Sequence, residues 1–384
     1  MANSIFRISL ITLPLFLFAC KEVECDLIES DPEQYIYETS IGASDNSAIW
    51  SFDRSIMFCG SKDDLISAFK VTQQGSILWM KYFDVGENAY ANGLVESADH
   101  EIFICGAASR VSGTVKSNLL LLKLTPMGDT VWTKTFETVM STGGERILLT
   151  KEQHLLVVGQ TNVFESDSFR NISISKLDLQ GILLWTKTFY SNTIDRAFGL
   201  IETLNGEYIV SGSRSLPGEY SELLLIRFDK NGDLLWEQKL GPQVKHGAST
   251  IELANGDLVS CGNYNNTNGS PETFSSLLVV KMNSYGSIIW EKEYGDSVFG
   301  EHGQCIKANH DGSFTISGYV LGSSSPGSDP LLLKIDSDGK MLWCEINTEP
   351  KYGSGTNLLK DIDDNNIVIG RDNGDTFMSI HNNH

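Results

Sequence analysis

The chain has 384 residues, of which 29 are basic and 49 acidic, so its formal net charge is −20. A charge of this sign repels phosphate backbones and argues against nucleic acid as a partner. The seven cysteines include no CxxC pair, which argues against a zinc-ribbon or thioredoxin-type redox site. The length suggests several domains, but a repeat architecture can use all of it as one domain.

The first nineteen residues predict a signal peptide. Arg7 precedes an apolar run at 8–18 that is too short to span a bilayer. The run ends in Leu17-Phe18-Ala19-Cys20, which resembles the lipobox of bacterial lipoproteins. That resemblance implies that Cys20 is acylated, palmitate included, and becomes the first residue of a membrane-anchored protein. The alternative is an ordinary secretory signal with an incidental cysteine, and either signal takes the mature protein out of the cytoplasm.

Residues 20–34 form an acidic, proline-containing segment, which predicts a solvated tether. A lysine and acidic residues directly after Cys20 resemble the export signal that sends some lipoproteins of Bacteroidetes-type bacteria to the cell surface. We therefore expect an outer membrane lipoprotein, with both the periplasmic and the cell-surface face left open.

Tryptophans recur through the rest of the chain at spacings of 53, 53, 51, 54 and 53 residues. Each has a glycine four residues earlier and a lysine or arginine nine residues earlier. A repeat of this length favours a four-stranded propeller blade over a two-helix solenoid unit. The six tryptophans are Trp79, Trp132, Trp185, Trp236, Trp290 and Trp343.

Short apolar segments between turn residues predict the strands of each blade. Strands that end in glycine occur seven times, at Gly60, Gly106, Gly159, Gly212, Gly262, Gly318 and Gly370, but only six have a tryptophan strand after them. Residues 35–42 resemble a tryptophan strand, and we expect them to complete the last blade, so that no edge strand is left unpaired. The prediction is an all-β fold, a single propeller of seven four-stranded blades over 35–384. A six-bladed ring with ragged ends is the alternative.

The repeat resembles propeller repeats of Bacteroidetes-type envelope proteins and the tryptophan-docking repeat of quinoprotein dehydrogenases and their non-enzymatic relatives. It consists of an Asn-Gly or Asp-Gly turn, a strand ending in glycine, a Leu-Leu-Leu-Lys-x-Asp-type strand and Trp-x-Lys-x-Phe. Such a pattern specifies fold far more than function. The quinoprotein enzymes usually have eight blades and a Cys-Cys pair against the quinone, and this chain has no Cys-Cys. We therefore expect no cofactor, and the tryptophans should pack between blades.

The long connections between second and third strands mark the face on which function is expected. The innermost positions of that face lie sixteen residues before each strand glycine and place Arg196, His246 and His302 on three consecutive blades. Asp195 and Glu301 directly precede two of them. This set could bind an anion, a sugar or a metal, or perform acid–base chemistry. The alternative is that these are solvated loop residues. The corresponding residues of the other blades are Ser44, Tyr90, Gly143 and Ser354.

Other features predict structure more than chemistry. Cys59, Cys105 and Cys261 each precede a strand glycine and should be small buried side chains. No residue pattern indicates a disulfide, although export would permit one. The acidic turn at 361–365 lacks the spacing of a calcium loop and is expected to be an ordinary strand turn. Aromatic residues of the long connections could contact a ligand or cover the blades: Phe164, Phe169, Tyr220, Tyr264, Phe274 and Tyr319.

These observations favour a non-enzymatic binding or scaffold module that contacts a glycan or an envelope protein through its long-loop face. No catalytic or metal-binding residue is assigned. The alternative is an enzyme with a site at the channel mouth, either a quinoprotein-like oxidoreductase or a hydrolase or lyase. A third possibility is a structural subunit of an envelope assembly.

Overall fold

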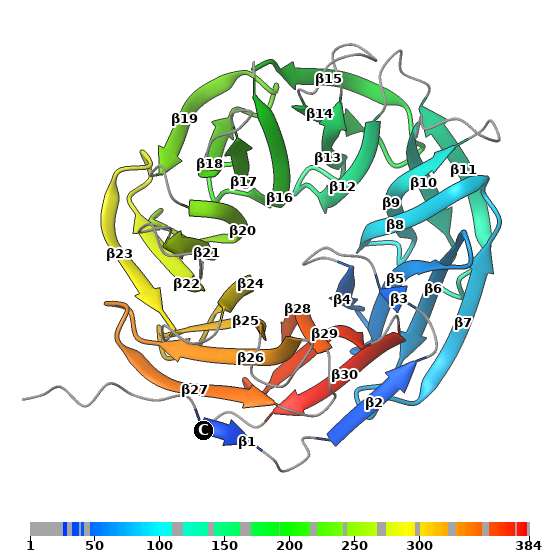
Figure 1. Ribbon diagram of the computed structural model, residues 1–384. Coiled ribbons are helices and arrows are strands. Elements are labelled where there is room, and N and C mark those ends of the chain that lie inside the picture. Colours follow the sequence, from blue (N-terminus) through cyan, green and yellow to red (C-terminus); the bar gives the residue numbers. More distant parts are fainter. Residues whose placement is uncertain are drawn as a thin grey trace, which may run out of the picture.

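The computed structural model describes the chain in segments, and every structural statement below concerns these residues. They are 26–28, 33–37, 40–41, 47–109, 118–136, 142–161, 170–191, 193–215, 221–240, 244–266, 274–295, 300–321, 328–347, 353–372 and 375–381. The regular elements in them are all strands, and these form seven sheets. Figure 1 shows the sheets as the blades of a closed ring. The seven-bladed propeller is thus confirmed and the six-bladed alternative is wrong.

The first four blades follow one another along the chain. Blade 1 contains β3 (Ser40–Ile41), β4 (Ala48–Trp50), β5 (Ile56–Lys62), β6 (Leu65–Val71) and β7 (Ile77–Phe83). Blade 2 contains β8 (Glu87–Glu96), β9 (Ile102–Ser109), β10 (Asn118–Leu124) and β11 (Thr130–Phe136). Blade 3 contains β12 (Thr142–Leu149), β13 (Leu155–Thr161), β14 (Asn171–Leu177) and β15 (Leu183–Phe189). Blade 4 contains β16 (Ile194–Glu202), β17 (Tyr208–Ser215), β18 (Ser221–Phe228) and β19 (Leu234–Leu240).

The last two blades also recruit strands from the N-terminal segment. Blade 5 contains β20 (Val244–Glu252), β21 (Leu258–Asn266), β22 (Phe274–Met282) and β23 (Ile288–Tyr294). Blade 6 contains β24 (Gly300–Ala308), β25 (Phe314–Leu321), β26 (Ser328–Ile335), β27 (Met341–Asn347) and β1 (Asp26–Ile28). Blade 7 contains β28 (Gly353–Lys360), β29 (Asn366–Asp372), β30 (Asp375–His381) and β2 (Glu33–Tyr37).

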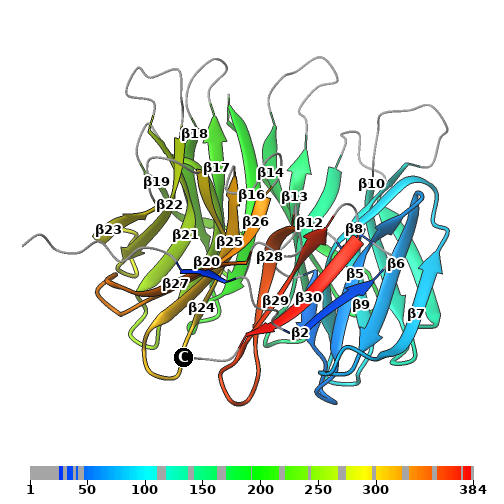
Figure 2. The ribbon, with the colours of Figure 1, turned by 60° about the horizontal axis from the view of Figure 1, so that its bottom comes forward.

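The N-terminal strand closes the ring as the repeat count predicted. Strand β2 pairs antiparallel with β30, with Tyr35 opposite Met378, so blade 7 receives its outer strand from the other end of the chain (Figure 2). The closing strand is shorter than the predicted 35–42, because residues 40–41 already pair with β5 of blade 1. Ordered structure also begins before residue 35, since β1 pairs parallel with β27.

Five of the six tryptophans pack on the turn glycine of the next blade, and the sixth, Trp343, packs on a buried cluster that includes Phe377 of blade 7. A Cβ atom added to Gly128 would lie 3.0 Å from ring carbons of Trp79, and one added to Gly181 would lie 2.9 Å from the ring of Trp132. Both glycines have positive φ angles, which side chains disfavour. At Gly75 of blade 1, the ring of Tyr35 takes the place of the tryptophan ring. The closing strand β2 therefore makes the same contact between blades 7 and 1.

Five of the six bases that lie nine residues before a tryptophan are buried and paired with a carboxylate, and the sixth, Lys281, is half-buried. Lys123 is 7% exposed, lies opposite Trp132 in the sheet and contacts Glu101 Oε2 at 2.6 Å. Arg227 makes the same type of contact with Glu207, also at 2.6 Å. The carboxylate comes from the turn between the first two strands of the same blade, so the ion pair fixes the inner hairpin against the outer strands.

The hydrophobic core lies between adjacent blades. Val259 and Cys261 of β21 belong to one buried cluster with Ile316 of β25. Cys59, Cys105 and Cys261 are buried, as predicted. Cys344 of β27, however, is disulfide-bonded, a bond that no residue pattern had indicated. The described residues include no helix that is long and apolar enough to span a membrane.

We predict that Gly128→Ala destabilises the fold more than Gly206→Ala. Both glycines have φ near 80°, so each variant should lose about 1 kcal/mol from the left-handed backbone alone. A Cβ at position 206 meets nothing within 4 Å, whereas at 128 it meets Trp79. The free energy of unfolding in urea should fall by at least about a further 1 kcal/mol for Gly128→Ala. Equal losses would show that the tryptophan contact does not constrain this turn.

Removal of the closing strand should destabilise the whole ring. A chain that begins at residue 38 lacks β2 and leaves β30 as an unpaired edge, which favours aggregation. We expect a lower midpoint of thermal unfolding and concentration-dependent association in light scattering. A monomer with the midpoint of the longer chain would show that closure by β2 contributes nothing.

Candidate functional site

The innermost strands bring the predicted mouth residues to one level of the ring. Arg196 pairs with Ser213, His246 with Asn263, and His302 with Tyr319. Each partner directly follows a strand glycine, so the three residues are equivalent positions of β16, β20 and β24. We call these positions, together with Tyr90 of β8 and Gly143 of β12, the mouth positions. The long connections beside them fall largely outside the described residues, as do Phe164, Phe169 and Tyr220.

The strand glycines explain how the mouth positions are held. A Cβ atom at Gly212 would lie 1.8 Å from the carbonyl oxygen of Arg196, and one at Gly318 would lie 1.8 Å from that of His302. The inner strand therefore approaches its neighbour so closely that only glycine fits there. A β-bulge follows in each case, between Ala197 and Gly199 in β16. Bulges redirect side chains and are frequent beside functional sites.

The two carboxylates predicted at the mouth are buried inside the structure. Asp195 has no exposed surface and accepts two hydrogen bonds from Arg214, Nε to Oδ1 at 2.9 Å and Nη2 to Oδ2 at 2.6 Å. Glu301 is 5% exposed, and its carboxylate lies against Gly295. Side chains of consecutive strand residues point to opposite faces. The residues directly before and after a mouth residue in the chain therefore point away from the mouth. Counting back from the strand glycines did not take this alternation into account.

The histidines differ in what the structure shows of them. His302 is half-buried, its Nε2 lies 2.8 Å from Ser275 Oγ, and its ring stacks on Tyr319 at 4.7 Å between centroids. The side chain of His246 lies outside the described residues. Arg196 is half-buried, and its Nε is enclosed without a hydrogen-bond partner among the described residues.

Sequence reasoning missed three arginines whose charges act on a carboxylate at the bulge of blade 3. Glu145 is the extra residue of that bulge, and Arg146, Arg170 and Arg196 all act electrostatically on its carboxylate. Arg146 comes from the same strand, Arg170 precedes β14, and Arg196 comes from the next blade. We call these four residues the arginine cluster. The arginines are 24 or more residues apart in the chain. The only sequence signal for this cluster was therefore that a bulge recurs at a constant distance before each strand glycine.

Burial controls the ionisation of Glu145. The pKa of Glu145 is raised because burial disfavours its charged form more than the three arginines favour it. Asn92 Nδ2 donates a hydrogen bond to Glu145 Oε2 at 3.2 Å. Burial also raises the pKa of the Tyr90 phenol to about 12, with Glu145 acting in the same direction. Tyr90 is therefore a neutral hydroxyl near a region of excess positive charge.

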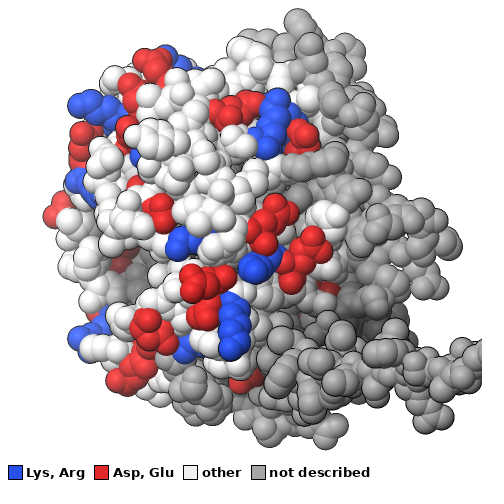
Figure 3. All heavy atoms as spheres, turned by 90° about the vertical axis from the view of Figure 1, so that its left-hand side faces the viewer, with Lys and Arg blue, Asp and Glu red and all other residues white. Residues whose placement is uncertain are grey.

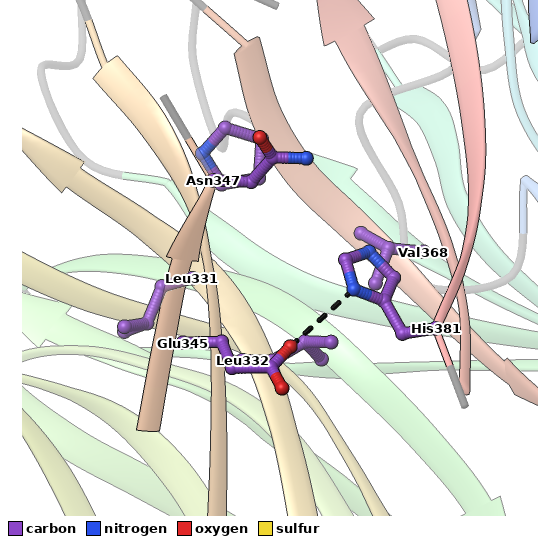
Figure 4. A pocket seen from close by; sticks show the side chains of 7 residues that line it. Leu331, Leu332, Glu345, Asn347, Val368 and His381 are labelled. Carbon is purple, nitrogen blue, oxygen red and sulfur yellow. Dashed lines mark ion pairs between the residues drawn. The ribbon is translucent and has the colours of Figure 1, made fainter. Parts of the chain in front are cut away.

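A small cavity lies elsewhere, between blades 6 and 7 (Figure 4). It is lined by Glu345, Asn347, His381 and apolar side chains and offers about 10 Å³, room for about one water molecule. His381 Nδ1 lies 3.4 Å from Glu345 Oε2, and its Nε2 lies 3.0 Å from Ser379 Oγ. The order of groups matches a serine–histidine–acid triad, but Ser379 is only 1% exposed. A nucleophile needs access to substrate, so we interpret these contacts as inter-blade packing.

Metal-binding geometry is not found in the described part of the chain. No group of three or more His, Cys, Asp or Glu side chains there could hold an ion. At the acidic turn, Asp361 Oδ1 accepts hydrogen bonds from the amides of Asp363 and Asn365 at 2.9 and 2.8 Å. This turn thus has the hydrogen bonds of an ordinary Asx turn.

Comparison with known proteins finds relatives in fold only. No family model matches the chain, and no curated protein matches it. Among solved structures it is similar to an ulvan lyase of polysaccharide lyase family PL25 bound to -[GlcA(1-4)Rha3S]-, with TM-score 0.60, 9% identity, and 92% and 94% of the two chains covered. It is also similar to the Neurospora crassa Pan2 WD40 domain, with TM-score 0.56 and 9% identity over 90% of this chain and 90% of that domain. YCF48 bound to D1 peptide has TM-score 0.54 and 10% identity, with 94% of this chain and 98% of YCF48 covered. These likenesses establish the propeller fold.

We predict that Asp195 stabilises the fold. Asp195→Asn weakens a buried ion pair with Arg214, and loss of one partner of such a pair costs about 3 kcal/mol. Asp233→Asn is the matched control, because Asp233 pairs with Lys187 and is 67% exposed, where an ion pair contributes less than about 1 kcal/mol. Urea unfolding of the two variants measures the difference. Equal stability would indicate that Asp195 is not a structural residue.

Proposed function

We propose that the protein is an envelope-anchored lipoprotein, attached through Cys20, that binds an acidic glycan at its mouth positions. One observation carries the ligand class: the positive charges of three arginines act on a single carboxylate, that of Glu145. With Glu145 ionised, this cluster has a charge of about +2 in a chain whose net charge is −20.

Guanidinium groups suit the acidic groups of glycans. Their planar fork donates two hydrogen bonds to a carboxylate or a sulfate, and partial burial strengthens each bond. Arg170 is exposed and within reach of a ligand, and Arg196 is half-buried with an unpartnered Nε. Tyr90 adds a neutral hydroxyl that can hydrogen-bond a sugar hydroxyl.

The outer wall offers no comparable concentration of basic residues in the view of Figure 3, which faces the side of β19 and β23. On the described part of that side, acidic and basic side chains are interspersed among uncharged residues. Mixed charges of this kind favour solubility over the capture of an anionic ligand. The arginine cluster is therefore the better candidate for recognition.

The choice of test ligands follows from chemistry and from fold. The ulvan lyase of the same fold is bound to a glycan that carries glucuronate and a sulfated rhamnose, so uronate-containing and sulfated oligosaccharides are the appropriate first ligands. The enzymatic alternative at this mouth would use His246 and His302. Product analysis after incubation with the same oligosaccharides distinguishes binding from cleavage.

Replacement of one cluster arginine should weaken binding of an acidic oligosaccharide. A hydrogen bond to a charged group contributes about 1.5–3 kcal/mol, so Arg196→Ala should raise Kd about ten- to a hundred-fold in calorimetry. Arg54→Ala is the control, because Arg54 lies exposed in the turn between β4 and β5. Equal affinity of both variants, or equal binding of neutral glycans, would refute this site and favour a protein partner.

Binding should strengthen as pH falls. The raised pKa of Glu145 means that it gains a proton at a higher pH than an exposed glutamate, and the cluster charge then rises from about +2 to about +3. Glu145→Gln should bind more tightly at neutral pH and lose this part of the pH dependence. His302→Gln should retain it. A wild-type Kd that does not change between neutral and acidic pH contradicts the role of Glu145.

A further inference from the structure

A polar hollow lies at the mouth between blades 1 and 2. It offers about 300 Å³, which is at the lower end of the size range of small-ligand sites. Blade 1 contributes the end of β5 and the turn to β6, and blade 2 contributes the start of β8, which runs beside them in the ring (Figure 1). The polar residues of its lining are Ser61, Lys62, Asp63, Asp64, Asn88 and Tyr90.

The connection above this hollow is short. Two residues, 63–64, join β5 to β6, and two residues, 373–374, join β29 to β30. In the other five blades the connection between the second and third strands is longer, and the shortest of those is 216–220. Because these connections surround the mouth, blades 7 and 1 are the side on which an extended ligand meets the fewest loop residues.

The turn of blade 1 presents two carboxylates at the hollow. Lys62 and Leu65 pair across the turn, and Asp63 and Asp64 between them have φ angles of 51° and 63°. These values match the two-residue hairpin turn in which both residues have positive φ. Both aspartates are exposed, so their carboxylates are accessible to a ligand.

Tyr90 connects the hollow to the arginine cluster. It lines the hollow, and a Cβ atom added to Gly143 of blade 3 would lie 2.8 Å from its hydroxyl oxygen. Gly143 lies two residues before Glu145 in the chain, and the charges of Glu145 and Arg170 both act on the Tyr90 phenol. The phenol therefore stands between the hollow and the cluster, where one ligand can contact both.

We propose that the hollow is a second subsite of the glycan site and holds an uncharged sugar residue next to an acidic one at the arginine cluster. This inference rests on the proposed function and narrows its ligand class. The ligand is then a glycan in which acidic and neutral sugars alternate, as distinct from a polymer of acidic sugars only.

The chemistry of the lining selects the uncharged residue. The carboxylates of Asp63 and Asp64 accept hydrogen bonds from sugar hydroxyls and repel a second carboxylate or sulfate. Ser61 and Asn88 add groups that both donate and accept hydrogen bonds. Two carboxylates and the ammonium of Lys62 give the hollow a formal charge of −1, opposite in sign to that of the arginine cluster.

Two tetrasaccharides test this selection. A hyaluronan tetrasaccharide alternates glucuronate with neutral N-acetylglucosamine, whereas an oligogalacturonate tetrasaccharide contains only acidic residues. Calorimetry with the exported wild-type protein should give a Kd at least about ten-fold lower for the alternating probe, because hydrogen bonds to charged groups contribute a factor of this size. Equal Kd values, or tighter binding of the all-acidic probe, would overturn the subsite.

The double variant Asp63→Asn/Asp64→Asn should shift the two probes in opposite directions. Asparagine also adopts the left-handed backbone conformation, so the turn is kept while both negative charges are lost. Kd should rise about ten-fold for the alternating probe and fall for the all-acidic probe, which is no longer repelled. Asp99→Asn is the control and should change neither Kd, because Asp99 is exposed in the turn between β8 and β9 on the opposite face.

Arg196→Ala separates the subsite from the proposed function. It should weaken both probes, since both contain the acidic residue that the arginine cluster holds. If Arg196→Ala weakens both probes while the double aspartate variant changes neither, the glycan site stands and the hollow has no part in it. If neither probe binds the wild type, the proposed function is wrong and the subsite is wrong with it.

Discussion

The structure depends on closing a ring from a linear chain. Six blades take all four strands from consecutive sequence, but blade 7 ends at β30 and would expose an unpaired edge. The pairing of β2 with β30 supplies the missing strand and makes the first and last segments of the chain neighbours. Stability of the ring is then cooperative, because the seam can open only by breaking contacts between the two ends of the sequence. The Cys344 disulfide lies on the strand next to this seam.

Glycine has two different roles in the repeat, and both are matters of space. At the turns, a positive φ and the tryptophan of the preceding blade leave no room for a side chain, as at Gly128. At the strand ends, a carbonyl of the inner strand occupies the place of a Cβ, as at Gly212. The first role spaces the blades, and the second fixes the mouth positions at one level. Function can vary at the mouth because the backbone there is held by glycines and not by the mouth side chains.

The residues at the mouth differ in chemistry from one side of the ring to the other. Blades 3 and 4 contribute Arg146, Arg170 and Arg196 around Glu145, whereas blade 6 contributes His302 stacked on Tyr319. Excess positive charge is thus concentrated on one side of the ring. Without this asymmetry, the blades would present equivalent positions at the mouth. The positive charge on blades 3 and 4 is the feature that favours an acidic ligand.

Much of the fold was determined by the sequence alone. The tryptophan spacing, the strand glycines and residues 35–42 predicted seven blades and their closure, because each repeat contains the residues that pack it against its neighbours. The equivalence of Arg196, His246 and His302 also followed from a constant offset. Tertiary structure decided the rest. The burial of Asp195 depends on Arg214, which counting residues does not place beside it. The arginine cluster joins residues of two blades at one bulge, and the pairing of β1 with β27 joins the two ends of the chain. These are contacts between segments distant in the chain, and no local pattern encodes them.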